Sequence, residues 1–423
     1  MSYTFKQVKT TDVDDFSKDN GIFFQTSNWC RFRRIFKPAA FLGFEDNTTT
    51  VLSCIIYKLP IYLTPFSIGY ITRGFVCDYS NTSLVKDFVD YLKDYCKKHH
   101  IVYLIFDPLA DYKINFVQPE EDKDIDKFFT SLGFIKNNGI LLQPPTNYKL
   151  KIKKETNIEI EKNRIYDIFP VKLKNDIQIS KDRGVVVERY KKNELDFAVK
   201  IFYDLLLETT SKKGFGHRDF NYYMNFARSL EDYVTIYLYK YNAEKDISYT
   251  EKVIIDVENQ LKHINEEISD PITTDKKRER LEQKRKEAEK QLSATKKRLE
   301  TAKQHTDNPY ISASFFIKMG NKAYNFYGAN STALRDLKLT ANYWDMIEDS
   351  LDGKVETFNM GGTLKLDTED IKKDHMYKLY QYKCQYNGEF SEFPGEYFLI
   401  FNKKLFNLFN NKLNYFRRII FKF

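Results

Sequence analysis

Apolar side chains between Glu244 and Gln304 recur at alternating spacings of three and four, a period that predicts helices with one apolar stripe. Asp270-Pro271 divides the stretch, because proline lacks an amide donor and disfavours a helical conformation in the residue before it. Arg285 and Thr295 are the polar residues that fall on the stripe. We therefore predict two consecutive coiled-coil helices. Their stripes consist of Ile254, Val257, Leu261, Ile264 and Ile268, and of Leu281, Ala288, Leu292, Leu299 and Ala302.

The charges of the two helices indicate how they pair. The first helix is predominantly acidic and the second predominantly basic. Opposite charges therefore flank the stripe when the second helix folds back on the first. An antiparallel hairpin over residues 244–304 fits this pattern better than one long rod. Two uses of the hairpin remain open, a dimerisation seam and an arm that reaches a large partner.

Predicted strands and helices alternate on both sides of the hairpin. This order predicts an α/β (α+β) protein in which the hairpin interrupts the second of two units. The predicted strands cover residues 5–9, 40–58, 101–106, 185–187, 234–239, 311–319 and 323–328, with a short one near Phe358. The predicted helices cover residues 83–99, 172–181, 195–209 and 339–350.

The length of 423 residues exceeds what one ordinary core supports, so we expect two globular domains and the hairpin. We place the first domain at 1–147 and the second at 148–380, interrupted by 244–304. A C-terminal segment, 381–423, is expected to return to the first domain. The chain is expected to be a monomer or a weak dimer.

The net charge is +8, which favours anionic partners such as nucleic acid, phosphate groups or an acidic membrane surface. Part of this charge lies in the last residues, where Leu405, Phe409, Leu413, Phe416, Ile420 and Phe423 return at helical spacing among basic residues. Such an amphipathic basic tail can lie in an anionic membrane interface. The part up to about Phe409 can equally pack across the first domain.

The sequence lacks the motifs that are typical of several functional classes. The five cysteines are scattered without a CxxC pair, which suggests neither a disulfide framework nor a zinc site. The chain has no G-x-S-x-G, P-loop or H-E-x-x-H motif, and we expect no metal and no cofactor. No apolar run approaches the ~20 residues of a membrane span. We therefore expect a cytoplasmic protein, with peripheral contact at the inner face of the membrane as a further expectation.

Six segments together resemble the Fem family, the aminoacyl-tRNA-dependent transferases that build the interpeptide bridge of peptidoglycan. They occur in the family's order, on both sides of the hairpin. The segments are residues 24–29 (FQTSNW), 70–79 (YITRGFVCDY), 106–108 (FDP), 214–223 (GFGHRDFNYY), the pair 322–329 (KAYNFYGA) and 343–347 (YWDMI), and 382–389 (YKCQYNGE). Thr72 and Phe75 replace two prolines of the family pattern, and Gln385 replaces a glycine.

The resemblance implies two tandem acetyltransferase-like (GNAT-like) domains, with the coiled-coil arm inserted in the second. It implies transfer of glycine, alanine or serine from aminoacyl-tRNA to the stem-peptide amine of a peptidoglycan precursor, lipid II or its nucleotide-linked form. Two other classes remain open. One is a GNAT-type N-acyltransferase that uses acyl-CoA, although no clear pyrophosphate loop is present. The other is a nucleic-acid-binding coiled-coil scaffold, which would explain the charge but not the ordered motifs.

The resemblance also suggests residues for each role. Asp107 would assist deprotonation of the amine, with capping of the turn at Pro108 as the alternative. Lys383 would stabilise negative charge near the ester, with a solvated lysine as the alternative. The precursor would be bound by Arg33, Tyr70, Arg73, Arg218 and Tyr327. The basic face of the second arm helix, with Lys284, Arg285, Lys296 and Lys297, suits tRNA phosphates. Trp29 and Trp344 are expected in the core.

Overall fold

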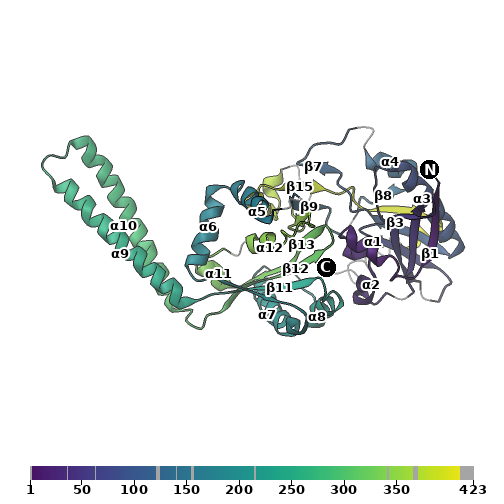
Figure 1. The fold of residues 1–423 in the computed structure, drawn as a ribbon, viewed down its shortest axis with the longest axis horizontal. Coiled ribbons are helices and arrows are strands. Elements are labelled where there is room, and N and C mark those ends of the chain that lie inside the picture. The colour runs from purple at the N-terminus through teal and green to yellow at the C-terminus, as the bar shows by residue number, and fades with distance from the viewer. Residues whose placement is uncertain are drawn as a thin grey trace.

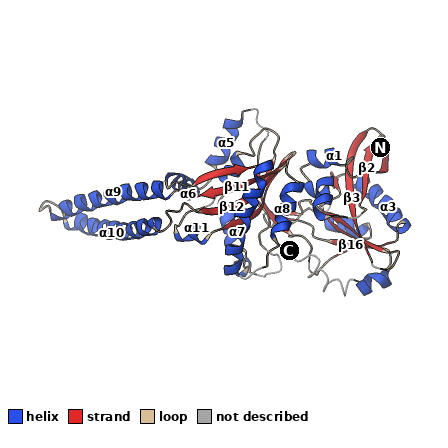
Figure 2. Cartoon of the chain, turned by 90° about the horizontal axis from the view of Figure 1, so that it is seen from below, coloured by secondary structure: helices blue, strands red, loops and turns tan. Residues whose placement is uncertain are grey.

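The computed structural model shows two mixed sheets side by side and a long helical hairpin that projects from the second (Figures 1 and 2). It describes residues 2–35, 37–61, 63–120, 124–139, 141–153, 157–213, 216–340, 343–364 and 370–409. Most of the predicted basic tail, residues 410–423, therefore lies outside the described residues. No helix among the described residues is long and apolar enough to cross a membrane.

Sheet 1 has the strand order β1-β2-β3-β4-β6-β16-β8, with β5 paired to β3. Its β4 and β6 run parallel, so their carboxyl ends meet at one edge. Helix α3 buries Leu84, Phe88 and Leu92 against one face, and Asn81 caps its first turn. The strands are β1 (Tyr3–Val8), β2 (Ala39–Glu45), β3 (Thr49–Pro60), β4 (Ser67–Thr72), β5 (Val76–Cys77), β6 (Ile101–Asp107), β8 (Ile135–Lys136) and β16 (Tyr397–Ile400). The helices of this part are α1 (Asp14–Asp19), α2 (Ser27–Arg33), α3 (Thr82–Lys98) and α4 (Ile125–Ser131), with a 3₁₀ turn at Phe23–Gln25.

Sheet 2 has the strand order β10-β11-β12-β13-β14-β9-β15-β7, in which only β13 and β14 run parallel. Helices α7 and α8 cover one face, while α5, α6 and α12 lie on the other (Figure 1). The strands are β7 (Lys113–Ile114), β9 (Thr146–Lys151), β10 (Val186–Tyr190), β11 (Val234–Lys240), β12 (Tyr310–Met319), β13 (Lys322–Asn330), β14 (Thr357–Asn359) and β15 (Glu389–Glu392). The helices are α5 (Ile158–Asp167), α6 (Val171–Asp182), α7 (Leu195–Lys213), α8 (Phe220–Ser229), α11 (Thr332–Asp336), α12 (Trp344–Glu348) and α13 (Tyr377–Cys384), with 3₁₀ turns at Lys192–Glu194 and Ile371–Lys373.

The chain passes between the sheets several times. Strand β7 lies at the edge of sheet 2, although its residues belong to the stretch that otherwise builds sheet 1. Strand β16, near the other end of the chain, inserts between β6 and β8 of sheet 1. The turn between β12 and β13 approaches α1 so closely that a Cβ on Gly320, whose φ is +53°, would lie 2.0 Å from the Lys18 carbonyl oxygen.

One apolar cluster continues from sheet 1 into sheet 2. Trp29 and Phe32 of α2 pack edge-on against Phe226 of α8, with ring centres 6.4 and 5.2 Å apart. Trp344 is buried against Tyr166 and Phe169 on the far side of sheet 2. The expected core positions of both tryptophans are therefore confirmed.

Helices α9 (Ala243–Ser269) and α10 (Asp275–Lys303) run back along each other (Figure 2). The buried residues of α10 include Leu281, Ala288, Thr295 and Ala302, which are stripe positions. Thr295 is tolerated there because its hydroxyl donates to the Gln291 carbonyl at 2.8 Å. Ion pairs Lys277–Glu267 (2.7 Å) and Lys296–Glu258 (2.8 Å) join the two helices.

One predicted helix is much shorter in the structure. Residues 339–350 were expected to be helical throughout, but α12 covers only Trp344–Glu348. Arg183 donates to the carbonyls of Leu337 (2.9 Å) and Lys338 (3.4 Å), and Lys338 has a left-handed φ of 52°. The backbone before α12 is therefore held in a turn.

Candidate active site

Asp107 ends β6 and is buried at the carboxyl edge of the parallel pair. Its Oδ1 accepts a hydrogen bond from the backbone N–H of Arg73 at 3.0 Å, and its Oδ2 lies 3.7 Å from the Arg73 Nε. Burial raises the pKa of the Asp107 carboxyl to about 7, although Arg73 opposes the rise. Oδ2 accepts no hydrogen bond from the described residues. One oxygen is thus structural, and the other is available to accept a proton.

Tyr70 and Arg73 stand beside Asp107 because β4 and β6 are parallel, with Tyr70 opposite Ile105 and Thr72 opposite Asp107. The Arg73 guanidinium donates to the Pro144 carbonyl at 2.8 Å and stacks 4.9 Å from the ring centre of Phe393. Arg73 therefore ties β4 to two later loops. The buried Tyr70 hydroxyl lies close enough to Asp107 to oppose the rise of that carboxyl's pKa, and burial raises the pKa of the Tyr70 phenol well above its usual value.

Lys383 is buried on α13. Its ammonium donates to the carbonyls of Gly361 at 2.9 Å and Gly362 at 2.7 Å. Burial lowers the pKa of Lys383 to about 7. A Cβ on Gly362 would lie 3.1 Å from Pro144, the residue whose carbonyl accepts from Arg73. Two adjacent loops therefore connect Lys383 to the Asp107 and Arg73 pair.

Arg33, Arg218 and Tyr327 come together where α2 meets α8. The guanidinium carbons of Arg33 and Arg218 lie 5.9 Å from the ring centre of Phe32 and 5.4 Å from that of Tyr222. The rings of Phe32 and Tyr222 are 5.1 Å apart, and the hydroxyls of Tyr222 and Tyr327 are 3.1 Å apart. Burial raises the pKa of Tyr327, and the positive charge of Arg33 opposes the rise. The structure thus gathers two cations and two phenols from both halves of the chain.

Tyr57, which we did not predict, joins this cluster to Asp107. Its ring centre lies 6.3 Å from that of Tyr70. Burial raises the pKa of Tyr57, and Arg33 is close enough to oppose the rise. Nothing in the sequence distinguishes Tyr57 from other aromatic residues of a buried strand, because its role depends on the neighbours of β3.

Glu396 is a second residue that sequence reasoning missed. It is buried just before β16, accepts from the Asn137 side chain at 2.6 Å and from the Leu142 N–H at 3.1 Å, and contributes to the raised pKa of Asp107. Its proximity to Asp107 arises because β16 pairs with β6. That pairing joins residues far apart in the sequence, and no local pattern indicates it.

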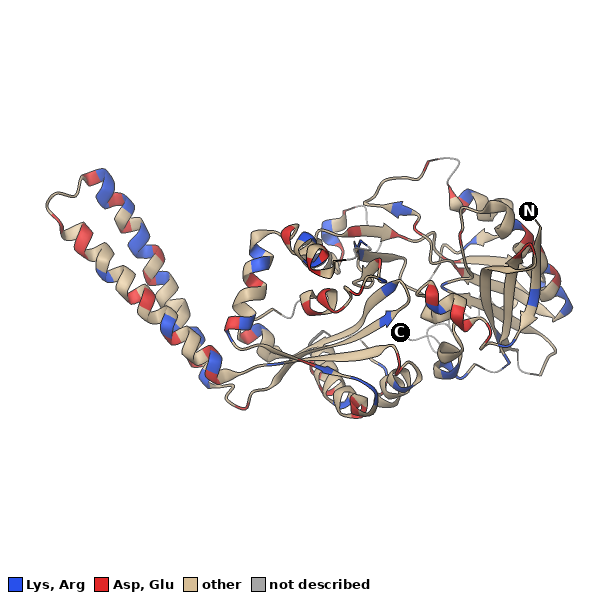
Figure 3. Ribbon diagram, in the orientation of Figure 1, with Lys and Arg blue, Asp and Glu red and all other residues tan. Residues whose placement is uncertain are grey.

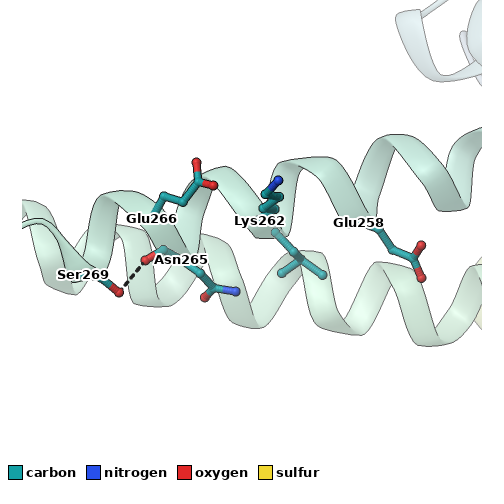
Figure 4. A pocket seen from close by; sticks show the side chains of 6 residues that line it. Glu258, Lys262, Asn265, Glu266 and Ser269 are labelled. Carbon is teal, nitrogen blue, oxygen red and sulfur yellow. Dashed lines mark hydrogen bonds between the residues drawn. The ribbon is translucent and has the colours of Figure 1, made fainter.

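The four predicted tRNA-binding residues lie on α10, away from these clusters on the arm (Figure 3). Arg285 pairs with Glu282 at 2.7 Å, and Lys296 pairs with Glu258 at 2.8 Å. Lys284 and Lys297 are exposed. A shallow depression on the arm is lined by Glu258, Lys262, Asn265, Glu266 and Ser269 of α9 (Figure 4). None of these residues takes part in the clusters around Asp107, Lys383 or Arg218.

The model of the FemAB family matches residues 8–412, nearly the whole chain. The chain belongs to the FemAB family. A lipid II:glycine glycyltransferase of Staphylococcus haemolyticus (strain JCSC1435) is 25% identical over 402 residues, covering 92% of this chain and 90% of that protein. Aminoacyltransferase FemA of Staphylococcus aureus (strain bovine RF122 / ET3-1) is 27% identical over 390 residues, covering 86% and 87%. A crystal structure of FemX shares the fold, with a TM-score of 0.68 and 19% identity over 96% of this chain and 99% of that one.

The FemAB assignment confirms the resemblance drawn from the motifs, and the structure gives a physical reason for one of them. Gln25 of the first motif is buried, donates to the Thr72 carbonyl at 2.7 Å and accepts from the Ile55 N–H at 2.6 Å. A Cβ on Gly74 would lie 2.8 Å from Gln25. The first two motifs of this FemAB chain therefore form one packed unit that positions Arg73.

Proposed function

We propose that this FemAB protein transfers glycine, alanine or serine from aminoacyl-tRNA to the stem-peptide amine of a lipid-linked peptidoglycan precursor, and so forms the interpeptide bridge in the cytoplasm. The family match and the aminoacyltransferase names of its relatives support the reaction class. The observation that best supports this site is a pair of buried ionisable groups that two adjacent loops connect. These are Asp107 and Lys383, each with a pKa shifted to about 7.

The proposal also includes an interpretation of how the two halves of the chain fold. We interpret the two halves as GNAT-like domains, with α9 and α10 as a coiled-coil arm inserted between β11 and β12 of the second. Two mixed sheets with helices on their faces and the burial of the apolar stripe support this interpretation. In this arrangement the active site takes residues from both halves.

The proposed reaction needs no cofactor because an aminoacyl ester is already activated. The stem-peptide amine attacks the ester carbonyl, a C–N bond forms, and the C–O bond to the tRNA ribose breaks. Asp107 Oδ2 accepts the proton of the amine, and the proton passes to the departing ribose oxygen. Protonated Lys383 stabilises the negative charge that develops on the carbonyl oxygen. The remaining catalysis is positioning of the two bound substrates.

Arg33 and Arg218 are proposed to bind the diphosphate of the precursor, because a guanidinium donates to phosphate oxygens in a planar, two-point geometry. Tyr327 would add a hydroxyl from the same cluster. Tyr70 would contact the precursor between this cluster and Asp107, and Arg73 would hold Asp107 in place. On the arm, exposed Lys284 and Lys297 are the better candidates for tRNA phosphates, since Arg285 and Lys296 already pair with glutamates.

The decisive experiment incubates the purified protein with glycyl-, alanyl- or seryl-tRNA and a lysine-containing lipid-linked precursor. Mass spectrometry should show a precursor that is heavier by one or more residues of one amino acid. Acetyl-CoA replaces aminoacyl-tRNA in a parallel reaction. Acetylated product, without product from any charged tRNA, would instead identify an acyl-CoA-dependent enzyme.

A further inference from the structure

The hairpin that joins β3 to β4 carries apolar residues to the surface of the protein. Leu63 is 88% exposed, and Leu59, Ile61 and Phe66 are only partly buried. We call these four residues the apolar tip. Leu59, Ile61 and Phe66 pack partly against the core, whereas Leu63 extends into solvent.

Two other segments lie beside the apolar tip, at the same end of sheet 1. The Ser67 N–H donates to the His100 carbonyl at 3.1 Å, and the rings of Phe66 and His100 are 6.2 Å apart. On the other side of β6, the Phe401 N–H donates to the Val102 carbonyl at 2.9 Å. Residues 403–409 are helical, pack Phe406 against Tyr103 and leave Leu408 51% exposed.

These three segments are basic and contain no acid. Residues 58–67, 97–101 and 401–409 include no Asp or Glu, and their lysines are Lys58, Lys97, Lys98, Lys403 and Lys404. The lysines of α3 and of residues 403–409 are exposed. Lys58 approaches Tyr95 at 3.3 Å. Burial lowers the pKa of His99, and the nearby charges of Lys58 and Lys98 lower it further. Exposed cations therefore occupy the segments at the same end of sheet 1 as the apolar tip.

We infer that this end of sheet 1 docks on an anionic phospholipid bilayer, with the apolar tip inserted among the acyl chains and the lysines at the headgroups. An exposed apolar side chain at the same end of the sheet as exposed lysines matches both layers of such a surface. A nucleic acid would use the lysines but offers no apolar partner for Leu63. The docking surface is formed by residues of the folded domain and does not depend on residues 410–423.

This inference rests on the proposed function, because docking at this surface would orient the lipid-linked precursor relative to Asp107. Strand β4 runs from Ser67 at the docking surface, past Tyr70, to Thr72 opposite Asp107. At roughly 3.3 Å per residue, Asp107 lies about 20 Å along β6 from Ile101. The lipid end of the precursor would stay in the bilayer at Ser67, its diphosphate would lie near Arg33 and Tyr57, and its peptide amine would reach Asp107.

The test is co-sedimentation of the full chain with vesicles of phosphatidylglycerol and phosphatidylcholine, and with vesicles of phosphatidylcholine alone. Leu63→Asp should lower the vesicle affinity roughly tenfold, because it removes one inserted leucine and adds an anion. Ile272→Asp is the matched control, since Ile272 is also 88% exposed but lies at the end of the arm. The double variant Lys403→Glu and Lys404→Glu should lower affinity only for the anionic vesicles.

A second readout separates this inference from the proposed reaction. Leu63→Asp should reduce transfer to the lipid-linked precursor in vesicles and leave transfer to a water-soluble precursor unchanged. If no precursor is modified by any variant, the proposed function fails, while the sedimentation result still decides the docking. Equal pelleting of wild type and Leu63→Asp would overturn the inference. So would a loss of tRNA affinity in the lysine variants with unchanged pelleting.

Discussion

At the scale of single residues, the site depends on ionisable groups that the fold removes from water. Asp107 is buried beside Arg73, Tyr70 and Glu396, and Lys383 donates to two glycine carbonyls. Burial disfavours the charged form of each group, which raises the pKa of an acid and lowers that of a base. Both pKa values approach 7, where proton transfer in either direction is easiest.

Replacing Asp107 by Asn tests whether its free oxygen acts as a base. The Asn side chain keeps an acceptor for the Arg73 N–H, so the fold should be retained. The wild-type kcat/KM should rise with pH up to about 7 as Asp107 ionises, and fall at higher pH as Lys383 loses its proton. The variant should lose roughly 10²–10⁴-fold in rate and lose this acidic limb of the profile. A variant with wild-type kcat/KM would show that Asp107 is structural.

Replacing Lys383 by Met should change how stability depends on pH. The folded-state pKa of Lys383 is about 7, below the ordinary lysine pKa of 10.5, so the unfolded chain binds more protons between these values. Stability therefore rises with pH in that window. The free energy of unfolding of the wild type should increase from pH 7 to pH 9.5 by an amount on the order of a few kcal/mol more than that of Lys383→Met.

Urea unfolding at several pH values measures this difference. Lys378→Met, an exposed change on the same helix α13, serves as the control and should keep the wild-type slope. Identical slopes for the wild type and Lys383→Met would contradict the assignment of a deprotonating lysine. In the separate transfer reaction with aminoacyl-tRNA and precursor, Lys383→Met should be inactive because the oxyanion loses its cation.

Replacing Arg218 by Ala should weaken precursor binding roughly 10–100-fold, because a charge-assisted pair of hydrogen bonds to phosphate is lost. Calorimetry with the precursor measures the affinity. Arg228→Ala is the control, since Arg228 lies on the adjoining helix α8 and makes an exposed ion pair with Asp196. Equal affinities of the wild type and Arg218→Ala would remove Arg218 from the proposed diphosphate site.

At the scale of elements, the direction of the arm is set by a buried polar network at its base. Arg183, which follows α6, forms two hydrogen bonds of 2.7 and 2.8 Å with Asp246 of α9. Tyr241 and Thr250 also donate to Asp246, at 2.7 and 3.2 Å. Arg298 of α10 lies nearby, and burial lowers its pKa. The arm is therefore fixed to the domain through a charged group, and not by its apolar stripe alone.

Replacing Asp246 by Ala should destabilise the protein by about 3–5 kcal/mol, because it leaves the buried Arg183 charge without a partner. The double variant Arg183→Met and Asp246→Leu should recover most of this loss. Urea unfolding monitored by circular dichroism measures both. Asp256→Ala, in the part of α9 remote from the network, should leave stability nearly unchanged. A similarly small effect of Asp246→Ala would show that the network does not stabilise the arm.

At the scale of the whole molecule, the arm projects the basic residues of α10 well away from the proposed active site (Figure 3). Reversing Lys284 and Lys297 to Glu should lower tRNA affinity and reduce the salt dependence of binding by about 0.7–0.9 per lost phosphate contact. Titrations at several salt concentrations measure the slope. Lys262→Glu, on the acidic helix α9, is the control. Unchanged binding after both reversals would give the arm another role.

The sequence predicted the features that depend on local periodicity. The stripe of the arm, the helix that became α3 and the strands around the hairpin all follow from spacing, since each element buries one face. The helix expected at 339–350 was too long because Arg183, distant in the chain, holds the preceding carbonyls. Tyr57 and Glu396 were missed for the same reason. Their positions depend on strand pairing across the fold, which has no local signature.

The crossing of the chain between the sheets has a consequence for how the enzyme is made. Sheet 1 lacks a strand between β6 and β8 until residues 397–400 have left the ribosome, although its other strands are made early. During that interval, the edge of β6 beside Asp107 is unpaired, and such edges invite aggregation. The first half of the chain therefore cannot complete its fold before the second half has been synthesised. Because β16 follows all other described strands in the chain, a chain that stops before residue 397 should be inactive.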